Sequence, residues 1–143
     1  MTRKKTGTAL LALGLMTAAL PAAAGELRVT VRGLPVEQGE LRVALYDSAS
    51  GFRAEKRFRG VILPARKGDV RADFTDLPLG RYGIAVLQDL NGNGKLDTNF
   101  IGMPTEPYGF GNDAMGRMGP PDFDATTVQV GNGITETSLD LRK

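Results

Sequence analysis

The residues with the clearest chemical pattern lie in segment 89–97, where side chains that carry oxygen recur at alternate positions. Positions one, three, five and nine of the segment are Asp89, Asn91, Asn93 and Asp97. A helix-loop-helix calcium loop takes oxygens from positions 1, 3, 5, 7 and 9 and turns sharply at a glycine in position 6. Gly94 occupies the sixth position, and the carbonyl of Lys95 would supply the seventh. The segment therefore predicts a weak Ca²⁺ site.

The pattern is incomplete, because position 12 of such a loop carries a bidentate Glu and here it is Phe100. Glu106, in a segment flanked by prolines, is the first candidate for the missing ligand, followed by Asp113 and Asn99. With two carboxylates in the loop, we expect a dissociation constant on the order of 10⁻⁴ to 10⁻³ M. Two alternatives stay open: the loop is only a turn held by Asn and Asp side chains, and Glu106 is a solvated carboxylate.

The chain has no histidine and no cysteine. Cys and Ser-His nucleophiles, a His base and nearly all zinc or copper sites are therefore excluded. A glycosidase-like hydrolase would have to use a carboxylate pair, drawn from Asp89, Asp97, Glu106 and Asp113. Interleaved Asp, Asn and Gly suit a cation cage better than such a pair, so we predict a non-enzymatic protein and keep the carboxylate-based hydrolase as an alternative.

A carbohydrate-binding module is a further alternative. Tyr108, Phe110 and Phe123 lie beside glycines and could stack on sugar rings, while Asn112 and Asp113 take the hydroxyls. The competing explanation is that the three rings pack inward, because a chain with 6% aromatic residues needs them in its core. We favour inward packing.

The hydrophobic pattern that must position these residues has period two, which is typical of half-buried strands. Alternating runs occupy 27–32, 41–46, 70–75 and 82–87, and a short apolar run occupies 61–63. The first two runs, separated by a turn over 33–39, are expected to pair as antiparallel neighbours. The run 82–87 ends where the oxygen-rich loop begins, so Asp89 should sit at the exit of a core strand.

Two more strands, joined around residues 131–133, are expected near 128–130 and 134–141. About seven short strands and no strong amphipathic helix predict an all-β, Ig-like or transthyretin-like sandwich. A short helical turn fits 52–56. The stretch 98–125 has no regular pattern, and we expect an ordered loop over one end of the sandwich.

The first 24 residues have the basic start, apolar run and small-residue end of a signal peptide, although a membrane anchor is the alternative. Cleavage near Ala24 would leave a single domain over 25–143 in the periplasm or outside the cell. The 18 Lys and Arg would fall to 15 against 16 Asp and Glu, a balance of −1, so no nucleic-acid partner is expected. A basic cluster over 53–67 is interpreted as a solvated edge, with a glycan or envelope component as a possible partner.

Several motifs together resemble an exported bacterial family known only as a domain of unknown function. Besides the 89–97 loop they are the segments 74–82, 102–106, 108–112 and 120–123. The resemblance covers essentially the whole chain after the signal. It implies a periplasmic or surface-exposed Ig-like or transthyretin-like sandwich, and it implies no activity.

Overall fold

The computed structural model describes residues 14–143. Its elements follow the chain in this order: β1 (Ala24–Leu34), β2 (Glu40–Tyr46), α1 (Ala49–Arg53), β3 (Arg59–Pro64), β4 (Gly68–Pro78), β5 (Gly80–Asp89), β6 (Tyr108–Phe110), η1 (Gly111–Asp113), η2 (Phe123–Thr126), β7 (Thr127–Val130) and β8 (Gly133–Asp140). The predicted signal peptide falls largely outside the described residues, and 14–23 form no regular element. No helix in the described range is long and apolar enough to cross a membrane.

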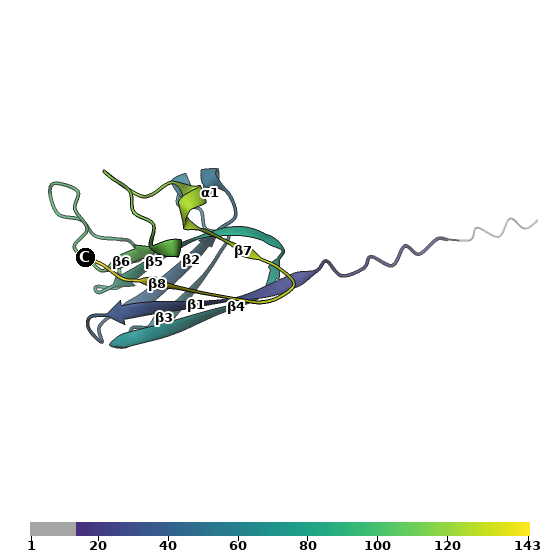
Figure 1. The fold of residues 1–143 in the computed structure, drawn as a ribbon, viewed down its shortest axis with the longest axis horizontal. Helices are drawn as coiled ribbons and strands as arrows, with labels where there is room; N and C mark the ends of the chain where they lie inside the picture. The colour runs from purple at the N-terminus through teal and green to yellow at the C-terminus, as the bar shows by residue number, and fades with distance from the viewer. Residues whose placement is uncertain (1–13) are drawn as a thin grey trace, which may run out of the picture.

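The strands form two sheets, which lie as two layers in Figure 1. One sheet has the order β4-β1-β8, with β1 antiparallel to β4 and parallel to β8. The other has the order β3-β2-β5-β6, and β7 pairs with β5 beside β6. The predicted all-β fold with two sheets is confirmed, with eight strands rather than about seven.

The core lies between the two layers. Alternate side chains of each strand point inward, and their burial is nearly complete because both sheets contribute one apolar face. The fully buried ones include Leu27, Val29 and Val31 from β1, Leu41 and Leu45 from β2, Leu77 from β4, Ile84 from β5 and Leu139 from β8. Tyr82, also in the core, donates its hydroxyl to the carbonyl of Pro78 at 2.6 Å and fastens the β4–β5 turn.

The expected pairing of the first two strands is wrong. β1 and β2 lie in opposite sheets, and β2 pairs with β3 and β5 instead. Alternation identifies which face of a strand is buried, but two strands that face one core from opposite layers show the same alternation as two neighbours. β7 and β8, joined around 131–133, likewise belong to different sheets.

The stretch 98–125 is ordered but not wholly irregular. It contains β6, which pairs with β5 from Leu87↔Tyr108 to Ala85↔Phe110, and the 3₁₀ turn η1. A strand of three residues with a central glycine has too little alternation to be recognised. A short helical turn is present as α1, but it spans Ala49–Arg53, three residues earlier than the predicted 52–56, and Ser48 is its N-cap.

Candidate metal centre

The candidate site begins at the last residue of β5. Asp89 is fully buried, on the outer face of the five-stranded sheet. Its Oδ2 accepts from Nε of Arg42 at 2.9 Å and from the backbone N–H of Gly94 at 2.7 Å. Nη2 of Arg42 also pairs with Glu40 at 2.9 Å. A core strand thus presents a carboxylate to the loop that follows it, as the sequence predicts.

The second oxygen of this carboxylate, Oδ1, is buried and has no hydrogen-bond partner among the described residues 14–143. Burial raises the pKa of Asp89, but the hydrogen bond from Gly94, the Arg42 guanidinium and the Gly92 N–H together outweigh it, so the pKa lies below its usual value. Asp89 is therefore an ionised carboxylate with one unsatisfied oxygen. Such an atom is costly to bury without a cation or donor.

The rest of the loop is organised around Asp97. Its two carboxylate oxygens accept from Nδ2 of Asn91 at 2.6 Å and from Nδ2 of Asn93 at 2.7 Å. The amide oxygens of the same asparagines accept longer bonds from backbone N–H groups, at 3.3 Å from Asn93 and 3.2 Å from Lys95. The side chains of Asn91, Asn93 and Asp97 are thus brought together in the hydrogen-bonded form of a turn. Asp89 is not part of this group and contacts Arg42 and Gly94 instead.

Glu106, nine residues after the end of this loop, folds back against it and is almost fully buried. Its Oε1 accepts the backbone N–H of Leu90 at 2.9 Å, and its Oε2 accepts the backbone N–H of Asp97 at 3.0 Å. The alternative of a solvated carboxylate is therefore wrong. By accepting one backbone N–H at each end of the loop, the Glu106 carboxylate joins the two ends.

The other two candidates for the missing ligand are engaged elsewhere. Oδ1 of Asp113 accepts the backbone N–H of Asp140, and Oδ2 lies 3.9 Å from Nη2 of Arg32. Oδ1 of Asn99 accepts the backbone N–H groups of Ile101 and Met103 within its own turn. Both side chains therefore bind other partners and do not supply a ligand oxygen beside the Asp89 carboxylate.

The arrangement of these residues determines how a cation could bind. Within residues 14–143, no group of three or more His, Cys, Asp or Glu side chains is arranged to hold a metal ion. A cation would rest instead on the carboxylates of Asp89 and Asp97, completed by amide and carbonyl oxygens of the loop, a donor set that suits Ca²⁺. Turning each asparagine amide about its terminal torsion would exchange its nitrogen for its oxygen. The chemical type of these donors suits Ca²⁺, while the guanidinium of Arg42 would compete with an ion for Asp89.

Comparison with known proteins gives the family. A family profile described as "uncharacterized protein conserved in bacteria" (DUF2141) matches residues 29–138, most of the chain. The chain belongs to the DUF2141 family. The resemblance to a bacterial family of unknown function is thereby confirmed. No curated protein and no solved structure gave a match.

Five of the nine aromatic side chains of this DUF2141 protein form a cluster on the outer face of the five-stranded sheet. Phe52 of α1 lies 5.3 Å from Tyr46, 5.9 Å from Phe123 and 6.1 Å from Phe110 between ring centroids. Tyr108 contacts Phe110 at 6.1 Å. All five rings are half-buried. The three candidate rings, Tyr108, Phe110 and Phe123, therefore lie outside the core between the sheets, and the prediction that they pack into the core is wrong, although each contacts a neighbouring ring.

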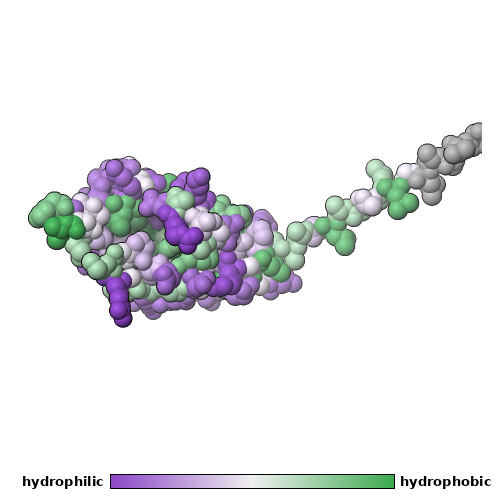
Figure 2. Space-filling model, turned by 90° about the horizontal axis from the view of Figure 1, so that it is seen from above, coloured by the Kyte–Doolittle hydropathy of each residue, from purple (hydrophilic) through white to green (hydrophobic). Residues whose placement is uncertain are grey.

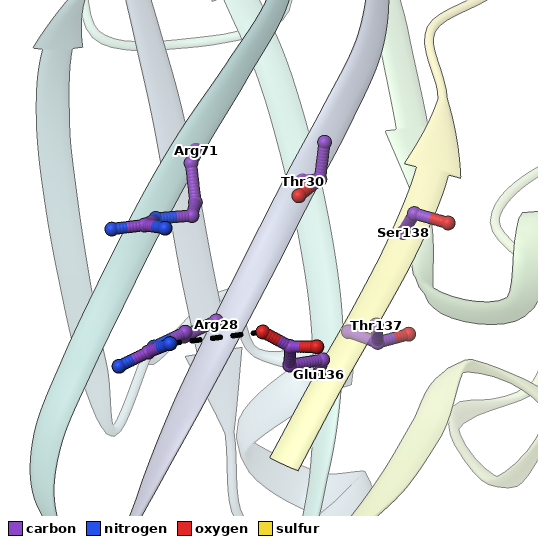
Figure 3. A pocket seen from close by; sticks show the side chains of 6 residues that line it. All are labelled: Arg28, Thr30, Arg71, Glu136, Thr137 and Ser138. Atoms are coloured by element: carbon purple, nitrogen blue, oxygen red, sulfur yellow. Dashed lines mark ion pairs between the residues drawn. The ribbon is translucent and has the colours of Figure 1, made fainter. Parts of the chain in front are cut away.

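A shallow hollow on the outer face of the other sheet is the alternative place for a ligand. It is lined by Arg28, Thr30, Arg71, Glu136, Thr137 and Ser138 (Figure 3). Its two arginines are already paired: Arg28 lies 2.8 Å from Glu26 and 3.7 Å from Glu136, and Arg71 lies 3.0 Å from Asp73. These ion pairs leave little free charge to attract an anionic ligand.

Sequence reasoning missed two residues of the DUF2141 site. Arg42 lies in β2, at a position where the alternating pattern predicts only an outward-facing side chain. Nothing in its own segment therefore indicates its ion pair with Asp89. Gly39 closes the β1–β2 turn, and a Cβ there would lie only 2.0 Å from the Asp89 carbonyl oxygen. A glycine at this position is typical of a turn, and Gly39 has a positive φ of 72°. Its contact with Asp89 could be predicted only from the pairing of β2 with β5.

Proposed function

We propose that this DUF2141 protein is a non-enzymatic, exported β-sandwich that binds Ca²⁺ at the 89–97 loop, and that the ion orders the adjoining segment 98–125 as an interaction face. The observation that carries the proposal is the buried, ionised Asp89 with an unpartnered Oδ1. A divalent cation would supply the missing partner of this oxygen.

The loop is well placed to influence the segment that follows it. Its far end is fastened by Asp97, whose backbone N–H binds Glu106 and whose carbonyl accepts from both the N–H and the hydroxyl of Thr105. β6 begins two residues after Glu106. A change in the order of the loop therefore acts directly on the attachment of segment 98–107 to β5.

The non-enzymatic part of the proposal rests on the state of the carboxylates. A glycosidase-like acid needs a raised pKa, whereas the pKa of Asp89 is lowered and its charge is opposed by Arg42. Glu106 already accepts two backbone N–H groups. Asp89 is arranged to remain charged, and Glu106 is held in position by its two backbone donors.

Thermal unfolding of protein freed of metal with a chelator, then titrated with Ca²⁺ to 5 mM, tests the proposal. With a dissociation constant on the order of 10⁻⁴ to 10⁻³ M, the ion should raise the free energy of unfolding by about 1–2 kcal/mol. The rise should disappear in Asp89→Asn and in Asp97→Asn. Asp73→Asn, which alters an exposed carboxylate of the other sheet, is the matched control and should keep it.

The relevant quantity is the difference with and without Ca²⁺ for each variant, so a loss of intrinsic stability in Asp89→Asn does not obscure the result. An equal rise in the wild type and in both loop variants would assign the effect to surface charge. No rise in the wild type at 5 mM would leave the loop as a turn held by its own side chains.

A further inference from the structure

The loop between the candidate site and β6 carries an apolar apex. Phe100 is 99% exposed, Ile101 is 68% exposed and Met103 is 58% exposed. No charged residue occurs from Thr98 to Thr105. Scattered apolar side chains are common on protein surfaces, but three on one short turn, one of them fully exposed, are typical of an interaction site.

The backbone of this apex is closed on itself. Asn99 donates to the Met103 carbonyl at 2.8 Å, and Gly102 donates to the Asn99 carbonyl at 3.0 Å. The Asn99 side chain accepts the N–H groups of Ile101 and Met103, and Thr105 donates to the carbonyl of Asp97. Each backbone group that is paired in this way lowers the cost of moving the turn out of water.

The apex is a projection rather than a hollow. In Figure 1 the loop between β5 and β6 extends from the end of the sandwich that lies opposite the N-terminal segment. Figure 2 shows apolar surface at this end of the molecule, bordered by polar surface. A convex apolar tip suits a soft, deformable layer better than it suits a preformed pocket.

We propose that the turn over 98–104 inserts into the surface of a phospholipid bilayer. Phe100 and Ile101 enter the acyl-chain boundary, and the exposed Lys95 lies at the level of the headgroups. The inference goes beyond the proposed function. Insertion itself needs no metal, so it stands or falls separately from Ca²⁺ binding.

The chain has no tryptophan, so a single introduced one reports its own surroundings. The exported protein carrying Phe100→Trp is titrated, in buffer with a chelator, with vesicles of phosphatidylethanolamine and phosphatidylglycerol. We expect its emission to shift to the blue and to be quenched when the lipid acyl chains are brominated. Leu79→Trp is the control, since Leu79 is 45% exposed at a turn beside Pro78, which pairs with Ala24 at the other end of the sandwich.

The control also separates the two ways in which the protein could reach a membrane. Binding through the N-terminal segment would shift the emission of Leu79→Trp and leave Phe100→Trp unchanged, which would overturn the proposal. Unchanged emission of both proteins would overturn it too. The proposal would also be overturned if Phe100→Ser abolished binding to an envelope protein while the vesicles caused no shift in the emission of Phe100→Trp.

Sedimentation with the same vesicles gives the magnitude. Phe100→Ser should lower the partition coefficient at least about tenfold, because a large apolar side chain no longer leaves water. Leu79→Ser should leave the partition coefficient unchanged. Since Phe100 is almost completely exposed, its replacement should not alter the melting temperature, and an unaltered partition coefficient in Phe100→Ser would contradict insertion.

Discussion

Arg42 donates from Nε to Oδ2 of Asp89 across 2.9 Å, from a side chain that is 26% exposed to one that is fully buried. The pair crosses from β2 to β5 and lies where the sheet meets the 89–97 loop. Arg42 therefore stabilises the negative charge of Asp89 from one side. Oδ1 of the same carboxylate is buried and has no hydrogen-bond partner among residues 14–143.

The lowered pKa of Asp89 predicts loss of stability in acid. Burial alone would raise the pKa, but the hydrogen bonds from Gly94 and Arg42 have the larger effect. The pKa in the folded protein therefore lies below the unfolded value of about 3.9. A depressed folded-state pKa adds stability that is present above the unfolded pKa and is lost as the pH falls through the folded pKa. Denaturant unfolding from pH 7 to pH 2 should thus show a shallower decline in Asp89→Asn than in the wild type, while Asp73→Asn should follow the wild type.

Removing Arg42 should destabilise the protein and strengthen its response to Ca²⁺. Arg42→Gln leaves the buried Asp89 without its cation, at a cost of about 2 kcal/mol, less than for a wholly buried pair because Arg42 is partly solvated. The same change removes the positive charge that competes with a metal. Unfolding with and without 5 mM Ca²⁺ should therefore give a larger difference than in the wild type. Equal destabilisation in both buffers would show that no cation replaces the guanidinium.

Glu106→Gln tests the closure of the loop. A carboxylate accepts at both oxygens, but an amide accepts only at one, so a backbone N–H of either Leu90 or Asp97 must face the amide nitrogen. The expected cost is about 1–3 kcal/mol. Amide hydrogen exchange at Leu90 and Asp97 should accelerate, whereas Glu37→Gln, at an exposed turn position, should change neither the stability nor the exchange.

Sequence patterning predicted the strands well because each one alternates independently. Leu27, Val29 and Val31 are all buried, as their spacing indicates. Which strands become neighbours depends on pairing across layers, and here prediction failed for the first pair. Contacts such as Gly39 against Asp89 join residues 50 positions apart and leave no local signal.

The candidate site shows the same division. The alternation of oxygens in 89–97 indicated that these side chains converge, and Asp97 does contact Asn91 and Asn93. The glutamate expected from outside the loop was also correctly placed near it. Its backbone contacts could not be foreseen, because the spacing of residues does not distinguish a carboxylate that binds metal from one that binds N–H groups.

The hydroxyl of Tyr82 predicts a specific contribution to the β4–β5 turn. Its bond to the Pro78 carbonyl, at 2.6 Å, joins the end of one sheet to the start of a strand in the other. Tyr82→Phe should cost about 1 kcal/mol in denaturant unfolding. Tyr46→Phe, which keeps the ring contact with Phe52, is the control. A smaller loss in Tyr82→Phe than in Tyr46→Phe would show that the bond contributes nothing to stability.

Two glycines with nearly the same backbone provide a direct measure of the contact between the β1–β2 turn and Asp89. Gly33 has φ 75° with open space around a built Cβ, whereas Gly39 has φ 72° and a Cβ that would lie 2.0 Å from the Asp89 carbonyl oxygen. Both alanine variants accept a left-handed backbone, at a cost of about 1–2 kcal/mol. Gly39→Ala must also displace the end of β5, so its unfolding free energy should fall further than that of Gly33→Ala. Its Ca²⁺-dependent rise should shrink as well, because Asp89 moves, while equal losses in the two variants would show that the turn can yield without disturbing the site.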